Sequence, residues 1–292
     1  MGFLLLKSLL FGILEGVTEW LPVSSTGHLI LLESFLTLDV GADLHPQFPA
    51  EFNELFLVAI QLGAVLAVIT KYQDRLIAPL FDRVGRGAAV SLWGRVIVGC
   101  FPAGIVGILA DYVLERLTGK DMDSWLFHGF VVACMLILYG VLFVITERMQ
   151  KGKEARVTEA GQLTLGQALG IGLFQTLSLV PGTSRSGATI LGGMLLGLSR
   201  TAAAEFSFFM AVPVMVGACG IKTLGFARFM LQNGLHMPYQ GAMVLLVAGV
   251  VAYVTSRLTI RFLIDFTSRH GFAVFGIYRI VLGAAVLLYV FI

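Results

Sequence analysis

The chain has 292 residues, of which 57% are hydrophobic and only 13% are charged, and its mean hydropathy is +0.89. These values lie outside the usual range of soluble domains and predict an integral membrane protein. The long apolar runs lack the alternation of an outer-membrane barrel, so the predicted class is all-α. The formal net charge of +2 argues against nucleic acid as a partner.

The first element expected along the chain is a helix hairpin over residues 1–38, in which two short apolar pieces flank a polar turn. The turn lies within the stretch EGVTEWLPVSSTGH, residues 15–28, whose proline, glycine and serines are typical of a chain reversal. A span needs roughly 20 apolar residues, and the two pieces fit that length poorly. The hairpin is therefore predicted to be re-entrant.

Transmembrane spans and a second hairpin are expected to follow. The second re-entrant hairpin should cover residues 165–198, around the polar turn PGTSRSGAT of residues 181–189. Apolar runs long enough to cross a bilayer start near Phe52, Gly94, Leu126, Glu205, Gly241 and Ala273. The expected fold therefore has about six transmembrane helices and two re-entrant hairpins.

The two halves of the chain resemble one another in sequence. A shift of 160 positions matches Gly12 with Gly172, Ser24 with Ser184, Gly27 with Gly187 and Ile30 with Ile190, and a shift of 154 matches Glu51-Phe52 with Glu205-Phe206. Residues 1–150 and 160–292 are therefore predicted to be two repeats within one membrane domain. Each repeat crosses the membrane an odd number of times, so the second should be inverted, with the paired hairpins meeting near the midplane.

Lysines and arginines in the short loops predict the orientation, because they concentrate on the cytoplasmic side of membrane proteins. One side should carry Lys71, Arg75, Arg83, Arg86, Arg148, Lys151, Lys153, Arg156, Arg257, Arg261 and Arg269, and the other only Arg116, Lys120 and Arg228, with Lys222 at a span edge. The first side is predicted to be cytoplasmic. The first hairpin then opens toward the external face.

Glu15 and Glu19 are the first candidate site residues. Because they are four positions apart, both carboxylates lie on one helix face, and two carboxylates in apolar sequence need a counter-charge. Oxygen ligands of this kind suit a divalent cation such as Mg²⁺ or Ca²⁺, so both residues are candidate metal ligands. The alternative is that the hairpin end reaches the membrane surface and both glutamates are solvated.

The turn that follows is predicted to open a helix capped by Ser24 or Ser25. Backbone amides at a helix start bind phosphate, which makes Ser24 and Thr26 candidate substrate-binding residues. Ser25 and His28 are three positions apart on one helix face, so the imidazole can take the serine proton or can itself attack phosphorus. The alternative is a capping serine beside a histidine at the membrane interface.

The second turn places Arg185 among hydroxyl side chains. Ser184, Ser186 and Thr189 surround it in sequence, and a guanidinium with hydroxyl and amide donors suits phosphate oxygens. These three residues are therefore candidates for substrate binding, and Arg185 is a candidate catalytic residue. The alternative is that Arg185 only neutralises one of the two glutamates of the first hairpin.

Two further polar residues occur in the predicted spans: Arg279 in the segment GIYR of the last span, and Glu205 at the start of the fourth. Charged residues at membrane depth commonly pair with one another. Mutual pairing accounts for both, so we expect them to support the site without touching the substrate.

These residues resemble the signatures of a known family. EGVTEWLPVSSTGH and PGTSRSGAT, with the segments AEFSF and GIYR, are similar to those of the undecaprenyl-diphosphate phosphatases, also called bacitracin-resistance proteins. The resemblance covers nearly the whole chain. It implies a multi-pass enzyme of the bacterial cytoplasmic (inner) membrane that removes the terminal phosphate of undecaprenyl diphosphate with a divalent cation. This reaction recycles the lipid carrier for cell-wall synthesis and confers bacitracin resistance.

Our hypothesis gives each candidate a role. Ser25 attacks the terminal phosphorus with His28 as base, or His28 forms the covalent bond itself, while Arg185 and the hairpin amides stabilise the phosphoryl oxygens. Glu15 and Glu19 hold the cation. Expected partners are the polyprenyl diphosphate, membrane lipids and a second copy of the chain in a homodimer. The alternative function is a flippase for undecaprenyl phosphate, because inverted repeats with paired hairpins are also a transporter architecture.

Overall fold

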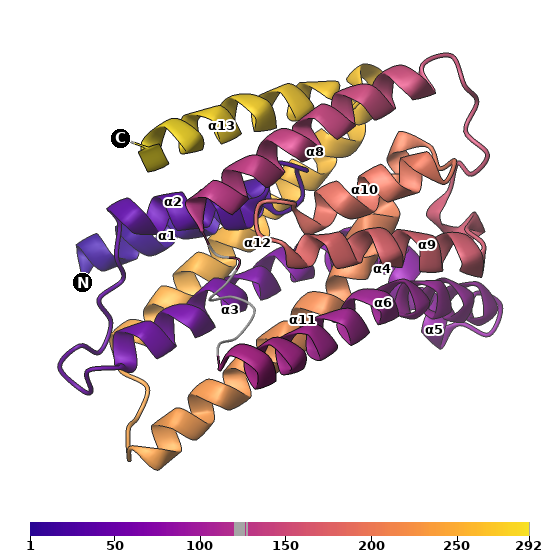
Figure 1. Cartoon of the computed structure of the whole chain (residues 1–292). Helices are drawn as coiled ribbons and strands as arrows, with labels where there is room; N and C mark the ends of the chain where they lie inside the picture. The colour runs from indigo at the N-terminus through magenta and orange to yellow at the C-terminus, as the bar shows by residue number, and fades with distance from the viewer. Residues whose placement is uncertain (120–125, 127, 292) are drawn as a thin grey trace. The chain divides into compact units, whose positions relative to one another are not determined.

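The computed structural model describes residues 1–119, 126 and 128–291, and its regular elements in these ranges are helices, apart from one isolated bridge between Val157 and Leu198 (Figure 1). The prediction of an all-α class is confirmed. The long helices are α3 Phe48–Lys71, α6 Arg86–Thr118, α8 Gly129–Gln150, α11 Arg200–Gln232, α12 Tyr239–His270 and α13 Ala273–Phe291. The shorter ones are α1 Gly2–Thr18, α2 Ser25–Phe35, α4 Gln73–Leu76, α5 Ala78–Phe81, α9 Leu165–Thr176 and α10 Arg185–Leu195, with 3₁₀ turns at Ala160–Gln162 and Leu177–Leu179.

Among the described helices, five (α3, α6, α8, α11 and α12) are long and apolar enough to cross a bilayer, and α13 is apolar but shorter than these. The protein is therefore an integral, multi-pass membrane protein. The helices α3, α6, α11 and α12 begin before their predicted starts, because a helix continues into the polar residues that flank its apolar run. The loop residue Lys120 of the orientation prediction lies outside the described residues, and the orientation itself stays a prediction.

Both predicted hairpins are pairs of helices joined by a turn: α1 and α2 within residues 1–38, and α9 and α10 within residues 165–198. The second hairpin begins at a capping box, in which Thr164 and Gln167 satisfy each other's backbone amides. It ends at Gly197, whose φ of +92° only glycine adopts readily. Re-entry and inversion refer to a membrane, so both remain predictions.

The chain folds into two compact units. The first unit consists of residues 1–20, 28–73 and 211–261, and the second of residues 21–27, 74–210 and 262–292. The helices α2, α11 and α12 each contribute residues to both units. Each unit therefore draws on both halves of the chain. The predicted repeat boundaries at residues 1–150 and 160–292 describe sequence similarity rather than compactness, and they stay a prediction.

An aromatic cluster forms the core of the first unit. The rings of Phe11 from α1 and Phe56 from α3 meet edge to face with their centroids 5.5 Å apart. Phe48 and Phe226 make the same kind of contact, also at 5.5 Å, and Phe52 stacks on Phe48. All five side chains are buried. Edge-to-face pairs add to the stabilisation that burial alone provides, so this cluster fixes α1 against α3.

Glycines bring α1 close to α12 within the same unit. A Cβ atom added to Gly16 would lie 2.7 Å from the carbonyl oxygen of Ala252, and one added to Gly12 would lie 3.1 Å from the Cα of Ala248. The hydroxyl of Ser256 donates to the carbonyl of Gly16 at 3.4 Å. Small residues allow such close helix packing in membranes. The helix α1, which carries Glu15 and has Glu19 as its C-cap residue, is therefore held in place by backbone contact.

The second unit is packed in the same manner. Helices α8 and α13 lie side by side (Figure 1), and a Cβ on either Gly140 or Gly276 would come within 2.6 Å of the other's carbonyl oxygen. The carboxylate of Glu147 on α8 pairs with Arg200 and accepts the backbone amide of Phe272 at 3.1 Å. These contacts fix the start of α13, the helix that carries Arg279.

Candidate functional site

The two polar turns share an unusual backbone. Ser24 has φ +75° and Ser184 has φ +71°, and in the described part of the chain they are the only non-glycine residues with positive φ. Each hydroxyl accepts the backbone amide three residues later, from Gly27 at 3.4 Å and from Gly187 at 3.1 Å. The two turns that the shift of 160 positions matches in sequence thus share one backbone geometry.

Each turn therefore opens a helix that a serine caps. Ser25 is the first residue of α2 and is half-buried, Thr26 beside it is exposed, and Arg185 is the first residue of α10 and is half-buried. The capping role falls to Ser24, one of the two serines considered for it, and Ser25 is left at the first helical position. Amides at a helix start carry partial positive charge, so both starts suit a phosphate group.

Arg185 is anchored by a residue that the sequence analysis missed. Its Nη1 donates to the carbonyl of Ser207 at 2.6 Å and contacts the Ser207 hydroxyl at 3.3 Å. The Thr189 hydroxyl contacts the same hydroxyl at 2.7 Å and donates to the carbonyl of Arg185 at 2.9 Å. Ser207 is fully buried within the segment AEFSF, and a serine inside an apolar span was the signal that could have identified it.

The two turns of the second unit also contact each other. The Ser186 hydroxyl donates to the carbonyl of Leu21 at 3.3 Å and lies 3.1 Å from the Ser184 hydroxyl. Ser24, Ser186 and Thr189 are buried, and Ser184 is half-buried. The structure thus brings the candidate hydroxyls of the second turn beside the backbone of the first.

Arg279 makes the most extensive described contact with both turns. It is fully buried, and it donates to the carbonyls of Pro22 at 3.0 Å, Gly182 at 2.7 Å and Thr183 at 2.9 Å. The expectation that Arg279 pairs with Glu205 is wrong. Glu205 pairs with Arg75 at 2.8 Å, and the described hydrogen bonds of Arg279 go to backbone carbonyls.

The remaining candidates belong to the first unit. Glu15 and Glu19 lie at the end of α1 and are buried, and the backbone amide of Glu19 donates to the carbonyl of Glu15 at 3.0 Å, which places the two residues one helical turn apart. His28 is half-buried on α2, three positions after Ser25. The alternative that both glutamates are solvated is wrong, because their exposed fractions are 0% and 6%.

The carboxylates of Glu15 and Glu19 fit a divalent cation only if other oxygens complete its coordination. Among the described residues, no group of three histidine, cysteine, aspartate or glutamate side chains gathers to form a metal cage. Mg²⁺ characteristically binds through one or two carboxylates and completes its shell with water and substrate phosphates. The two buried carboxylates of Glu15 and Glu19 match the one or two carboxylates through which Mg²⁺ binds.

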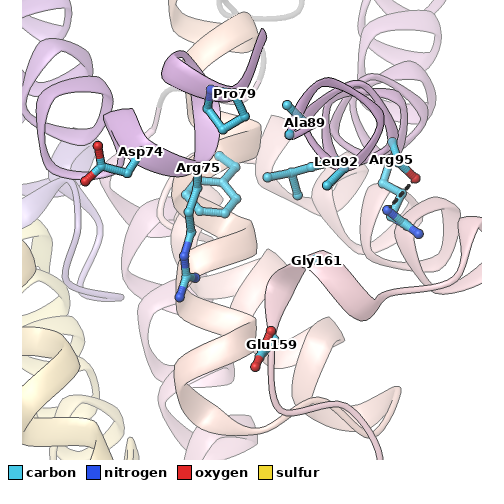
Figure 2. A pocket seen from close by; sticks show the side chains of 12 residues that line it. Asp74, Arg75, Pro79, Ala89, Leu92, Arg95, Glu159 and Gly161 are labelled. Carbon is cyan, nitrogen blue, oxygen red and sulfur yellow. Dashed lines mark hydrogen bonds between the residues drawn. The ribbon is translucent and has the colours of Figure 1, made fainter. Parts of the chain in front are cut away.

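A separate cavity of about 360 Å³ lies elsewhere in the second unit (Figure 2). Figure 2 shows Asp74 and Arg75 from α4, Leu92 and Arg95 from α6, and Glu159 around it. None of the candidate site residues lines this cavity, and its charged residues are of both signs. This cavity therefore does not suit a diphosphate as well as the two turns do.

Comparison with known sequences adds a second line of evidence. Residues 8–285 match the family described as bacitracin resistance protein BacA. The chain belongs to this family. An undecaprenyl-diphosphatase of Desulfitobacterium hafniense is 45% identical over 97% of this chain and 95% of its own length. Those of Streptococcus gordonii and Enterococcus faecalis are 46% and 43% identical, covering 98% and 97% of this chain and 95% and 96% of their own.

Proposed function

We propose that this protein hydrolyses undecaprenyl diphosphate to undecaprenyl phosphate and inorganic phosphate in the bacterial cytoplasmic membrane. The observation that carries the proposal is the pair of serine-capped helix starts, one of which begins with Arg185. Such a pair offers cationic and amide donors to phosphate groups within a multi-pass membrane protein. The relatives named undecaprenyl-diphosphatase support the same substrate.

The reaction we propose has two balanced steps. The Ser25 oxygen forms a bond to the terminal phosphorus, His28 takes the serine proton, and the bond from that phosphorus to the bridging oxygen breaks, so that undecaprenyl phosphate leaves. Water then attacks the phosphoserine and releases inorganic phosphate, which restores Ser25. If His28 is the nucleophile, the same two steps pass through a phosphohistidine and consume the same single water.

Arg185 serves the phosphoryl group in this scheme. The Ser207 carbonyl holds one side of its guanidinium and so fixes the plane of the group that we propose stabilises the phosphoryl oxygens. We keep Ser24, Thr26, Ser184, Ser186 and Thr189 as proposed substrate-binding residues. Four of these hydroxyls are also used inside the protein, as caps or in contacts between hydroxyls, so we expect them to act mainly by shaping the two turns.

Glu15 and Glu19 are the residues that would hold a divalent cation, Mg²⁺ or Ca²⁺. A cation bound there supplies neutralisation of the charge that develops on the leaving phosphate. The test of this part is the dependence of phosphate release on added cation in the wild type and in Glu19→Gln. An activity that chelation leaves unchanged would contradict a role for the cation.

The test of the proposed function is phosphate release from undecaprenyl diphosphate by the detergent-purified chain. We expect release by the wild type and its loss in Ser25→Ala and Arg185→Ala, measured with and without Mg²⁺ or Ca²⁺. Each variant should retain the melting temperature of the wild type, so that a fall in activity reports chemistry. Absence of release from folded wild type would contradict the proposal.

The alternative transport function has its own measurement. Translocation of undecaprenyl phosphate across vesicles needs phosphate recognition, but it needs neither a nucleophile nor a base. If the chain is the proposed phosphatase, Ser25→Ala should abolish hydrolysis. Translocation by the wild type and by Ser25→Ala, without hydrolysis by either, would support a flippase and displace the phosphatase.

We further propose that the site opens toward the external face and that the reaction recycles the lipid carrier. Bacteria that express the active chain should then tolerate more bacitracin than those that express Ser25→Ala. Accessibility of a cysteine placed at the exposed Thr26 to a membrane-impermeant reagent would test the orientation. The homodimer stays a prediction that the mass of the protein in detergent can test.

A further inference from the structure

A single buried arginine contacts the backbone of both polar turns. Arg279, on α13, donates to Pro22 of the first turn and to Gly182 and Thr183 of the second. Its three acceptors are carbonyl oxygens, and in the described part of the chain no carboxylate pairs with it. A buried arginine that has no carboxylate partner and whose two terminal nitrogens donate to three main-chain carbonyls holds the backbone in place.

The guanidinium is itself held from several sides. It lies over the ring of Tyr139 on α8, with Cζ 5.5 Å from the ring centroid. A Cβ atom added to Gly187 would lie 3.0 Å from Nη1, so the first turn of α10 packs directly on the arginine. On the other side of the turn, a Cβ on Gly182 would lie 2.8 Å from the Cα of Val132. The arginine therefore occupies a fixed position between α8, α10 and the two turns.

These hydrogen bonds determine where the amide of Ser184 points. No cis peptide bond occurs in the described chain, and in a trans peptide the N–H and C=O point in opposite directions. Because the Thr183 carbonyl faces Arg279, the N–H of Ser184 in the same peptide unit faces away from it. The other two carbonyls that Arg279 binds belong to the peptide groups Pro22-Val23 and Gly182-Thr183. The N–H groups of those peptides are already bonded locally, since Val23 donates to Leu21 at 2.7 Å and Thr183 donates to Val180 at 3.2 Å.

The same bonds account for the strained conformation of Ser184. Its φ of +71° with ψ of +124° is disfavoured for a residue with a side chain, and such conformations persist only where surrounding contacts enforce them. Arg279 holds the carbonyls of the two residues that precede Ser184. The capping hydroxyl of Ser184 holds the other side through Gly187.

We infer that Arg279 is a positioning residue for phosphate transfer: it clamps the carbonyls of both turns so that the Ser184 amide and the first amides of α10 are aimed at the phosphoryl oxygens. The inference rests on the proposed function, and it assigns Arg279 no contact with the substrate. Lysine cannot replace it, because one ammonium group does not match three carbonyls arranged around a planar guanidinium.

The experiment compares Arg279→Lys and Arg279→Met with the wild type, and uses Arg75→Lys as a matched control at an ion pair of the separate cavity. We expect kcat to fall about 100-fold in both Arg279 variants, which is the usual loss when one preorganised donor to the reacting group is displaced. KM should change much less, because donors aimed at the transition state serve ground-state binding little.

A second measurement, the binding of vanadate, distinguishes a positioning role of Arg279 from a role in stability, and it does not depend on the proposed activity. Vanadate adopts the trigonal geometry of the transferring phosphoryl group, so its binding to the wild type should weaken in Arg279→Lys by about the same factor as kcat. Binding is measured as a shift in melting temperature, which requires no turnover. Unchanged vanadate binding and kcat in Arg279→Lys would overturn the inference. If the wild type shows no phosphatase activity but binds vanadate, and this binding weakens in Arg279→Lys, the role of Arg279 is upheld and only the proposed function is overturned.

Discussion

The two polar turns have the same backbone geometry and different chemistry. At positions related by the shift of 160, Glu15 corresponds to Gln175, Glu19 to Leu179, Ser25 to Arg185 and His28 to Ala188. The backbone elements are retained, since Ser24 and Ser184 both adopt positive φ and both cap a helix. Glu15, Glu19, Ser25 and His28 all lie in the first hairpin, and the guanidinium of Arg185 lies in the second. If the proposed function holds, the two similar turns divide the work between a reactive turn and an anion-binding turn.

The spans that follow the hairpins show the same division. Asn53 and Ser207 correspond under the shift of 154, and each contacts the second helix of its own hairpin. Asn53 donates to Glu33 on α2, whereas Ser207 accepts from Arg185 on α10. The equivalent position thus supports a carboxylate in the first half and the candidate catalytic arginine in the second. The supporting residue has changed together with the residue that it supports.

The largest expected effect comes from the arginine of the anion-binding turn. Arg185→Lys keeps the charge but cannot both hold the Ser207 carbonyl and present a planar fork to phosphate. We expect phosphate release to fall about 1,000-fold, at the lower end of what a transition-state arginine contributes in phosphoryl transfer. Arg95→Lys, at an arginine of α6 that contacts Ser91, is the matched control. A fall of less than tenfold in Arg185→Lys would contradict the division between the turns.

A smaller effect should distinguish the two equivalent glycines. A Cβ on Gly187 would lie 3.0 Å from Nη1 of Arg279, whereas the nearest contact for a Cβ on Gly27 is 3.4 Å, to the Ser24 hydroxyl. Gly187→Ala therefore displaces the clamp and should lower kcat by about 10- to 100-fold, the scale of a misplacement by one ångström. Gly27→Ala should cause a clearly smaller fall. Equal effects would show that displacement of Arg279 is not the cause of the loss in Gly187→Ala.

The fold class and the main spans could be predicted because lipid leaves the backbone little choice. A chain with 57% hydrophobic residues has to close its backbone hydrogen bonds within helices, and apolar length then locates five of them. The polar turns were also predictable, because serines, glycines and an arginine are conspicuous in apolar sequence. The helix ends were not, since hydropathy marks the lipid-facing run and α6 and α11 continue beyond it.

The contacts that organise the site could not be predicted in the same way. Arg279 binds the carbonyl of Pro22 across 257 positions, and carbonyl acceptors leave no trace in a sequence. Charge logic suggested a partner of opposite sign, which led to the wrong pairing with Glu205. Positive φ was equally hidden, because it falls on Ser24 and Ser184, residues that more often adopt ordinary conformations. Gly187 is required for close approach to the arginine instead.

The smallest expected effect is on the free energy of unfolding, which one substitution of Ser184 should lower and another should raise. Ser184→Ala removes the cap and keeps the strained backbone, so the free energy of unfolding should fall by about 1 kcal/mol. Ser184→Gly loses only a few tenths of a kcal/mol from the cap and relieves strain of about 1–3 kcal/mol, part of which is offset by the greater freedom of glycine in the unfolded chain. The glycine variant should therefore unfold at a higher temperature than the wild type.

The control for this prediction is Ser199, which caps α11 by accepting the amide of Ala202 at 3.1 Å and has an ordinary φ. Both Ser199→Ala and Ser199→Gly should lower the melting temperature in detergent, because no strain is present for glycine to relieve. Ser184→Gly should also lose phosphatase activity while it gains stability. A glycine at position 184 is free to adopt other backbone conformations, so its amide is no longer held toward the phosphoryl group. A glycine variant that is less stable than wild type would show that the turn is not strained, and the clamp would then have nothing to enforce.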